Sequence, residues 1–297
     1  DPVLVRGDGR YLYMLPSVVD DIDFGITHVI RGEDHVVNTA VQIQLFRALG
    51  AEPPRFAHLP LLTDIAGMGL SKRHGSITLK SLRDAGIEPM ALNSCLASLG
   101  ASDRPEPHQT LDEMASRFDI SVYGRATPKF DESQLWHMNS RLLQQLPFEA
   151  VAARLKERGL DEADARFWEA IRPNLARLGD AADWYAVCYG EITPVIVDAD
   201  LLSEAAARLP PEPWTENTWP AWTRAVQATT GRKGKALFLP LRLALTGVAH
   251  GPELRLLLPV IGRERALRRL TSRAGVLTSA DALPPFASER FARKAGT

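Results

Sequence analysis

A strand–helix–strand pattern near the start of the chain constrains its fold more than any other sequence feature. Residues 26–30 form a β-branched run, and residues 56–63 form a second extended run. Between them, Val41, Leu45 and Leu49 recur at the spacing of one helix face. Two strands joined by a single helix favour a parallel pair with a right-handed crossover. The front of the chain is therefore expected to be α/β.

The back of the chain is expected to be helical. Beyond about residue 125 there is little strand signal, and residues 210–213 (PPEP) read as a linker. Two apolar stripes have helical spacing: Phe148, Val151, Ala152 and Leu155, then Phe167, Ile171, Leu175 and Leu178. The fold class predicted for the whole chain is α/β plus all-α.

Composition excludes several classes of protein. Hydrophobic residues make up 45% and charged residues 24%, as in an ordinary globular protein. No apolar run approaches the roughly 20 residues of a membrane span, so no membrane partner is expected. With two cysteines and no His-x-x-x-His spacing, neither a disulfide framework nor protein-bound zinc is expected. Cys95 lies in an apolar stripe and is expected to be a core thiol, and a reducing cytoplasm is the simplest location.

Charge is balanced overall but not locally. The net charge is −1, whereas residues 224–273 hold eleven basic and two acidic residues. This basic block is a candidate face for a polyanion. The alternative is a set of packed helices with solvated basic outer faces.

Polar residues gather around the first strand. Asp20, Asp21 and Asp23 form a carboxylate cluster that suits acid–base or metal chemistry, or else caps a helix or faces solvent. Arg31 and the residues after it follow the strand at the edge where ligands collect in parallel sheets. Arg31 could hold a carboxylate bidentately, or pair with a neighbouring acid at the surface.

A glycine-containing loop follows the second extended run. Residues 70–73 (LSKR) place a lysine beside backbone donors, which suits a polyphosphate. There is no Walker loop and no Gly-x-Ser-x-Gly elbow, which argues against two common enzyme classes.

These signals occur together in an order that resembles the bacterial-type glutamyl-tRNA synthetases, a class I family. The resemblance covers nearly the whole chain. The segments that carry it are residues 13–34, Gly69–Arg73 (similar to the KMSKS loop), Trp136–Asn139, Pro240–Gly247 and Ile261–Leu267. It implies the second half of a Rossmann-type catalytic domain over 1–75, a stem-contact domain over 76–146, and helical anticodon-binding subdomains over 147–210 and 211–297.

The resemblance also implies a glutamate pocket. Arg31 would pair with the side-chain carboxylate of glutamate, and Tyr13 would line the same pocket. Ser17 falls where the family often has a polar residue near that carboxylate. Asp21 would help to hold the amino end of the substrate.

ATP would bind beside the glutamate. The resemblance places Glu33, Asp34, His35, Leu70, Ser71, Lys72 and Arg73 near ATP. Ser71 and Lys72 would be the catalytic residues, steadying the phosphates while glutamyl-adenylate forms. Mg²⁺ would arrive with the ATP rather than in a protein cage.

The tRNA would contact the back of the chain. Arg172 and Asn174 lie about where the family reads the third anticodon base. Arg232, Lys233, Lys235 and Arg242 belong to the basic block, for which phosphate contacts are expected. The expected partners are tRNA(Glu), L-glutamate and ATP, and a monomer is expected.

Two departures from the family pattern bear on activity. Gly69 replaces the first lysine of the KMSKS pattern. No HIGH-like motif precedes the first strand, so this polypeptide alone is expected to form adenylate poorly. The alternatives left open are a non-catalytic tRNA-binding fragment, a glutaminyl-type synthetase, whose anticodon part is built from β-barrels, and a non-discriminating enzyme that also charges tRNA(Gln).

Overall fold

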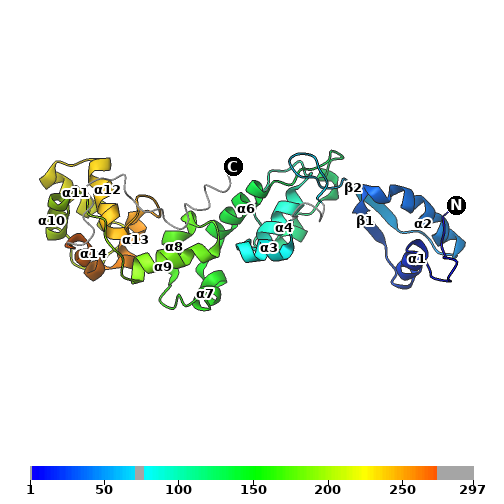
Figure 1. Cartoon of the computed structure of the whole chain (residues 1–297), viewed down its shortest axis with the longest axis horizontal. Helices are drawn as coiled ribbons and strands as arrows, with labels where there is room; N and C mark the ends of the chain where they lie inside the picture. The colour runs from blue at the N-terminus through cyan, green and yellow to red at the C-terminus, as the bar shows by residue number, and fades with distance from the viewer. Residues whose placement is uncertain (1, 71–76, 273–297) are drawn as a thin grey trace. The chain divides into compact units, whose positions relative to one another are not determined.

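The computed structural model describes residues 2–70 and 77–272, which fall into two compact units (Figure 1). The front unit comprises Asp1–Thr78, Asn93–Glu106 and Asp112–Glu132, and the helical unit comprises Leu79–Leu92, Pro107–Leu111 and Ser133–Thr297.

The front unit contains the predicted parallel pair of strands. Its elements are α1 (Met14–Asp23), β1 (His28–Gly32), a 3₁₀ turn (Glu33–His35), α2 (Val36–Ala48) and β2 (Arg55–Leu59). The strands pair in parallel, with His28 opposite Arg55 and Gly32 opposite Leu59. A short helix, α5 (Leu111–Ser116), and a 3₁₀ turn (Ile120–Val122) follow later in the chain. The α/β prediction for the front of the chain is therefore confirmed.

The front unit buries little apolar surface by itself. Val18 and Phe46 are buried, but Phe24 and Val37 are 79% and 76% exposed. No residue of β1 or β2 is fully buried, although parallel sheets are normally covered on both faces. The unit therefore has a thin core for its size.

The described part of the helical unit has no strand longer than a single residue pair. Most of its helices pack around one continuous core, so the prediction of a helical back half is confirmed. The helices that contribute to this core are the end of α6 (Glu132–Gln145), α7 (Phe148–Lys156), α8 (Ala165–Ile171), α9 (Ala181–Tyr189), α10 (Ala199–Ala207), α11 (Thr218–Thr230), α12 (Lys235–Thr246), α13 (Leu254–Ile261) and α14 (Arg263–Leu270), with 3₁₀ turns at Arg172–Asn174 and Leu178–Asp180. The unit also contains α3 (Leu79–Ala85) and the first part of α4 (Pro89–Ser98), which lie outside this cluster.

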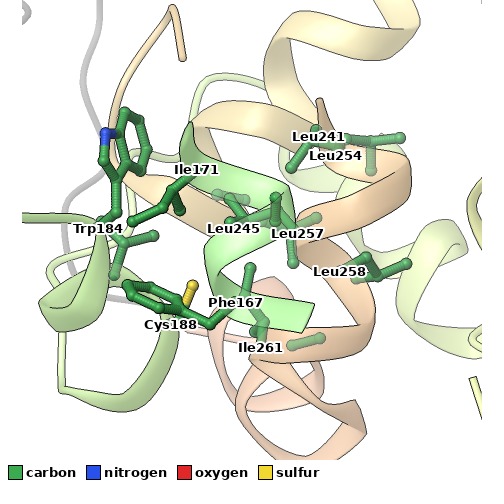
Figure 2. Packing of buried hydrophobic residues seen from close by; sticks show 14 of the residues in the cluster. Phe167, Ile171, Trp184, Cys188, Leu241, Leu245, Leu254, Leu257, Leu258 and Ile261 are labelled. Atoms are coloured by element: carbon green, nitrogen blue, oxygen red, sulfur yellow. The ribbon is translucent and has the colours of Figure 1, made fainter. Parts of the chain in front are cut away.

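The core of this unit draws on helices that are far apart in sequence. Figure 2 shows Phe167 and Ile171 of α8 facing side chains of α9, α12 and α13. Both belong to the predicted apolar stripes and are fully buried. Cys188 lies in the same cluster, where burial raises the pKa of its thiol to about 12. Cys95 is also buried, as predicted, so both thiols are structural.

Gly251 fixes the loop between α12 and α13 against this core. Its φ is +141°, and a Cβ at this position would lie 2.1 Å from Cη2 of Trp184. The loop backbone therefore rests directly on the indole ring, and a side chain there would have to displace it. This contact sets the position of the residues that begin α13.

Asn139 joins three segments of the helical unit. Its side chain is completely buried on α6. Oδ1 accepts a hydrogen bond from the backbone N–H of Glu88 at 2.7 Å, and Nδ2 donates to the carbonyl of Ala176 at 2.6 Å. The Glu88 carboxylate accepts two hydrogen bonds from Arg154, of 2.9 and 2.6 Å. One amide thus holds together the start of α4, α6 and the loop after α8.

None of the helices in residues 2–70 and 77–272 combines the length and apolar character that crossing a bilayer requires. The same ranges hold no group of three or more His, Cys, Asp or Glu side chains placed to bind a metal ion.

Replacing Asn139 with alanine should destabilise the helical unit by about 1–3 kcal/mol, because a buried N–H loses its partner. Urea unfolding followed by far-ultraviolet circular dichroism measures this. The control is Asn217→Ala, at an exposed position whose side chain caps nothing, with an expected change within about 0.5 kcal/mol. Equal effects of the two substitutions would contradict the role assigned to Asn139.

Candidate functional site

Arg31 lies on β1, opposite His58 of β2 in the strand register. Its Nη2 donates hydrogen bonds to Oγ1 of Thr39 and Oε1 of Gln42, both at 2.6 Å. Its guanidinium carbon lies 5.5 Å from the centre of the Phe56 ring. The side chain is therefore held in one place by α2 and β2.

The charge of Arg31 is not neutralised by a contacting carboxylate. Within the described residues it forms no ion pair with Glu33 or Asp34, so the alternative of a surface pair with these acids is not what the structure shows. Its Nε is buried and has no hydrogen-bond partner there. A fixed guanidinium that forms no ion pair with these acids is well suited to bind the carboxylate of a ligand.

Ser17 is connected to Arg31 through Gln42. Nε2 of Gln42 donates to Oγ of Ser17 at 3.0 Å, while its Oε1 accepts from Arg31. Thr39 makes a second link, because its Oγ1 lies 2.9 Å from Nε2 of His58. The structure thus brings together two of the predicted glutamate-pocket residues.

Sequence reasoning missed Thr39 and Gln42, which are both buried on α2. The signal was present: together with Phe46 they occupy the buried positions of α2 at intervals of three and four residues. Two polar residues on the buried face of a helix indicate partners on the neighbouring strand.

Asp21 lies close enough to Arg31 to feel its charge. Burial raises the pKa of the Asp21 carboxyl, the Arg31 guanidinium lowers it, and Asp20 adds a smaller upward effect. Burial is the largest of the three, so the folded-state pKa is above its usual value. Asp21 is therefore placed with Arg31 and Ser17, on the neighbouring helix α1.

The residues predicted to lie near ATP follow β1 directly. The ring of His35 lies edge-on to Tyr13, with centroids 6.2 Å apart. Asp34 folds back over the end of the strand, where a Cβ on Gly32 would lie 2.5 Å from its Oδ1. Glu33 is exposed. Tyr13 is thus associated with His35, at the carboxyl end of β1.

The loop that precedes the predicted catalytic residues has an anchored base. Thr63 pairs with Gly69, and its carbonyl accepts the N–H of Phe130 at 2.7 Å. The Asp64 carboxylate accepts the N–H of Met68 at 2.8 Å. Leu70 is exposed just beyond this base. Ser71, Lys72 and Arg73 lie outside the described residues.

The predicted tRNA-binding cations are spread over the start of α12. Arg232 pairs with Asp198 at 2.9 Å. Lys233 and Lys235 are exposed and make no ion pair with the described residues. Phe238 and Arg242 continue the helix from Lys235 at spacings of three and four residues, so the three share one face.

Arg242 lines a pocket of about 290 Å³ whose other walls are Trp219, Phe238, Glu253, Leu254 and Arg255. Nη2 of Arg242 donates to the carbonyl of Pro252 at 2.8 Å, whereas its buried Nη1 has no partner among the described residues. Burial lowers the pKa of Arg242. The rings of Trp219 and Phe238 are 6.2 Å apart, and Phe238 is 44% exposed. Two aromatic rings and an arginine side chain thus line one hollow.

Arg172 and Asn174 differ in their surroundings. Arg172 donates to the carbonyl of Leu146 at 3.1 Å and to the carboxylate of Glu169 at 2.8 Å. It therefore ties the 3₁₀ turn to the end of α6. Asn174 is exposed, and its side chain makes no hydrogen bond within the described residues.

Two family models match the chain. The model described as tRNA synthetases class I (E and Q), catalytic domain, matches residues 1–137. The model described as anticodon binding domain matches residues 107–273.

Similar proteins agree with these matches. A glutamate–tRNA ligase 1 of Parvibaculum lavamentivorans is 59% identical over 272 residues, which is 91% of this chain and 60% of the relative. A glutamate–tRNA ligase of Azospirillum brasilense is 58% identical, with the same shares covered. The crystal structure of a glutamate tRNA ligase from Elizabethkingia meningosepticum, in complex with its amino acid, is 25% identical with a TM-score of 0.73, over 91% of this chain and 61% of that one. The chain spans about 60% of the length of the curated relatives it matches.

Replacing Arg31 with glutamine should raise the pKa of Asp21 further, because the Arg31 charge lowers it in the wild type. Carbon-detected NMR titration of the carboxyl measures this. The raised pKa makes Asp21 stabilise the fold at low pH, a contribution lost as pH rises through the folded-state value. The control is Arg47→Gln, on the exposed side of α2, which should leave Asp21 unchanged. No response to either substitution would contradict the placement.

Proposed function

The chain belongs to the class I tRNA synthetases of the glutamate and glutamine type, and we propose that it serves the ATP-dependent ligation of L-glutamate to tRNA(Glu) through glutamyl-adenylate. The observation that carries the proposal is Arg31, a guanidinium that forms no ion pair with the described residues and is held rigidly at the carboxyl end of a parallel strand. Its guanidinium would bind the side-chain carboxylate of glutamate.

The neighbours of Arg31 support this role. Thr39 and Gln42 are neutral acceptors, so they orient the guanidinium without cancelling its charge. Ser17 is positioned by Gln42 and would add a hydroxyl to the pocket, with Tyr13 on its wall. Asp21 would face the amino group of the substrate, where an ammonium would favour its ionised form.

Adenylate formation needs little covalent chemistry from the protein. An α-carboxylate oxygen of glutamate attacks the α-phosphate of ATP, the bond to the β-phosphate breaks, and pyrophosphate leaves. The acyl group then passes to the terminal adenosine of the tRNA, and AMP leaves. Charge stabilisation would come from Ser71 and Lys72, with Leu70, Arg73, Glu33, Asp34 and His35 around the nucleotide, a proposal that rests on the sequence motif.

The carboxylates near the end of β1 fit an Mg²⁺ ion that arrives bound to ATP rather than one held by the protein alone. Mg²⁺ usually takes one or two carboxylates together with substrate phosphates. Glu33 and Asp34 are exposed carboxylates beside the end of β1 and would be available to such a complex.

The back of the chain would bind the anticodon arm. In the pocket of Arg242, a splayed base would stack on Phe238 and Trp219 while the Arg242 guanidinium donates to its edge. Lys233, Lys235 and Arg232 would contact phosphates nearby. Exposed Asn174 is a better candidate than Arg172 for the third anticodon base, since Arg172 already binds Leu146 and Glu169.

A glutaminyl-type enzyme is disfavoured, because the described residues from Phe148 to Leu270 are helical and the relatives are named glutamate–tRNA ligases. The domain division that we propose is 1–75 catalytic, 76–146 stem-contact, and 147–210 and 211–297 anticodon-binding. A cytoplasmic monomer is part of the same proposal.

Replacing Arg31 with alanine should lower kcat/KM for glutamate by roughly 30-fold or more, because removing one partner of a buried charge pair costs about 2–5 kcal/mol. Glutamate-dependent ATP–pyrophosphate exchange measures this, on this chain and on a chimera completed from the Parvibaculum relative. Arg47→Ala is the matched control, and RNA affinity should stay unchanged in both variants. Normal glutamate kinetics in Arg31→Ala would refute the pocket.

Replacing Phe238 with alanine should weaken binding of an anticodon-arm hairpin of tRNA(Glu) by roughly tenfold, since stacking contributes about 1–3 kcal/mol per base. Fluorescence anisotropy of a labelled hairpin measures this on the 297-residue chain. Phe118→Ala is the control, at an exposed phenylalanine of the front unit. If both variants bind as tightly as the wild type, the pocket does not hold a base.

A further inference from the structure

A small hollow beside α14 gathers three arginines. It has a volume of about 90 Å³, and its walls are Glu191, Ile192, Pro194, Arg265, Arg268, Arg269 and Ser272. Arg268 and Arg269 follow Arg265 on α14 by three and four residues, so each lies next to Arg265 on the helix surface. The space suits a small ion and is well below the size of a typical pocket for an organic ligand.

Arg269 supplies a buried charge at this place. Its side chain is 5% exposed, with Nη1 donating to the carbonyl of Leu245 at 2.8 Å and Nη2 to that of Gly190 at 3.0 Å. Both acceptors are neutral, and within the described residues it contacts no carboxylate. Burial lowers the pKa of Arg269 to about 10; Cys188 and Glu191 oppose this shift, and the charges of Arg265 and Arg268 add to it. Buried charge of this kind is costly unless an opposite charge lies nearby.

Arg265 and Arg268 add two more positive charges, and only one carboxylate, Glu191, pairs with either of them among the described residues. Arg268 pairs with Glu191 at 3.1 Å, but their side chains are 54% and 82% exposed, so the pair is weak. Arg265 donates to the carbonyl of Ile261 at 3.3 Å and lies 5.9 Å from the ring of Tyr189. It makes no ion pair with any described residue. Three guanidiniums thus share one exposed carboxylate.

We propose that this hollow binds a phosphate group of an RNA backbone, through Arg265 and Arg268 at its mouth and the fixed charge of Arg269 beneath them. Guanidinium groups match the oxygens of a phosphate with paired hydrogen bonds. Glu191 competes for Arg268 and would be displaced by the phosphate. The choice of RNA as the source of the phosphate rests on the proposed function, whereas the anion site itself rests on the geometry.

The first arm of the test uses inorganic phosphate and the 297-residue chain. Nitrogen–proton NMR of the arginine side chains should show Arg265 and Arg268 shifting as phosphate is added. Arg265→Gln should weaken this binding roughly threefold to tenfold, and Glu191→Gln should tighten it, because the competing carboxylate is gone. Arg224→Gln is the control: it removes a charge of the same basic block, from an exposed arginine bonded to the Pro220 carbonyl on α11.

The second arm uses the anticodon-arm hairpin at several salt concentrations. In Arg268→Gln the slope of log K against log salt should fall by about 1, whereas the Phe238→Ala variant should keep its slope. Glu191→Gln should bind the hairpin more tightly than the wild type.

The outcomes separate the two claims. If phosphate moves neither arginine, or if Glu191→Gln and Arg265→Gln bind it like the wild type, the anion site is refuted. If phosphate binds but the hairpin responds to none of these variants, the assignment to RNA is refuted. If the hairpin binds the wild type and Phe238→Ala weakens it, the proposed function stands whatever the phosphate arm shows.

Discussion

The hydrogen-bond partners that hold Arg31 are neutral oxygens, so they orient its guanidinium without neutralising it, and the candidate amino-acid site depends on this. Arg31 is oriented by a hydroxyl and an amide, through two hydrogen bonds of 2.6 Å. An Asp or Glu at position 39 or 42 would hold Arg31 equally firmly but would also neutralise its charge. An acidic ligand would then bind much more weakly. Thr39 and Gln42 therefore decide whether the strand end can bind an anion, although neither is charged.

Much of the fold was predictable because it follows from residue periodicity. The parallel strands appear where the apolar spacing predicted them, and the stripe from Phe167 to Leu178 is buried in the core. The helix predicted for that stripe ends at Ile171, and 3₁₀ turns follow it. Partners in tertiary structure were not predictable in this way. The sequence around Gln42 does not show that its side chain contacts Ser17 of α1 and Arg31 of β1. Likewise, Trp219 and Phe238 line one pocket only because α11 and α12 pack together. The catalytic role of residues 71–73 remains a prediction from the sequence.

Arginine serves two different purposes in this protein. Arg154 and Arg172 bind carboxylates and carbonyls, which stabilises the junctions between helices. Arg242 has one terminal nitrogen bound to a carbonyl and leaves the other without a partner inside a hollow. A count of basic residues over 224–273 could not separate these uses, because it treats an arginine that stabilises the fold and an arginine that can bind a ligand as equal. Hydrogen-bond partners, not charge density, separate the two.

The continuous core that runs from Leu143 to Leu270 has a consequence for evolution. All of its tryptophans and leucines come from helices and loops of one compact unit, so this core is built within that unit. A segment that satisfies its own burial can be duplicated, shuffled or fused to a different partner without first acquiring new contacts. The helical unit can therefore diverge at its own pace, and recombination at its borders would yield folded hybrids on which selection can act.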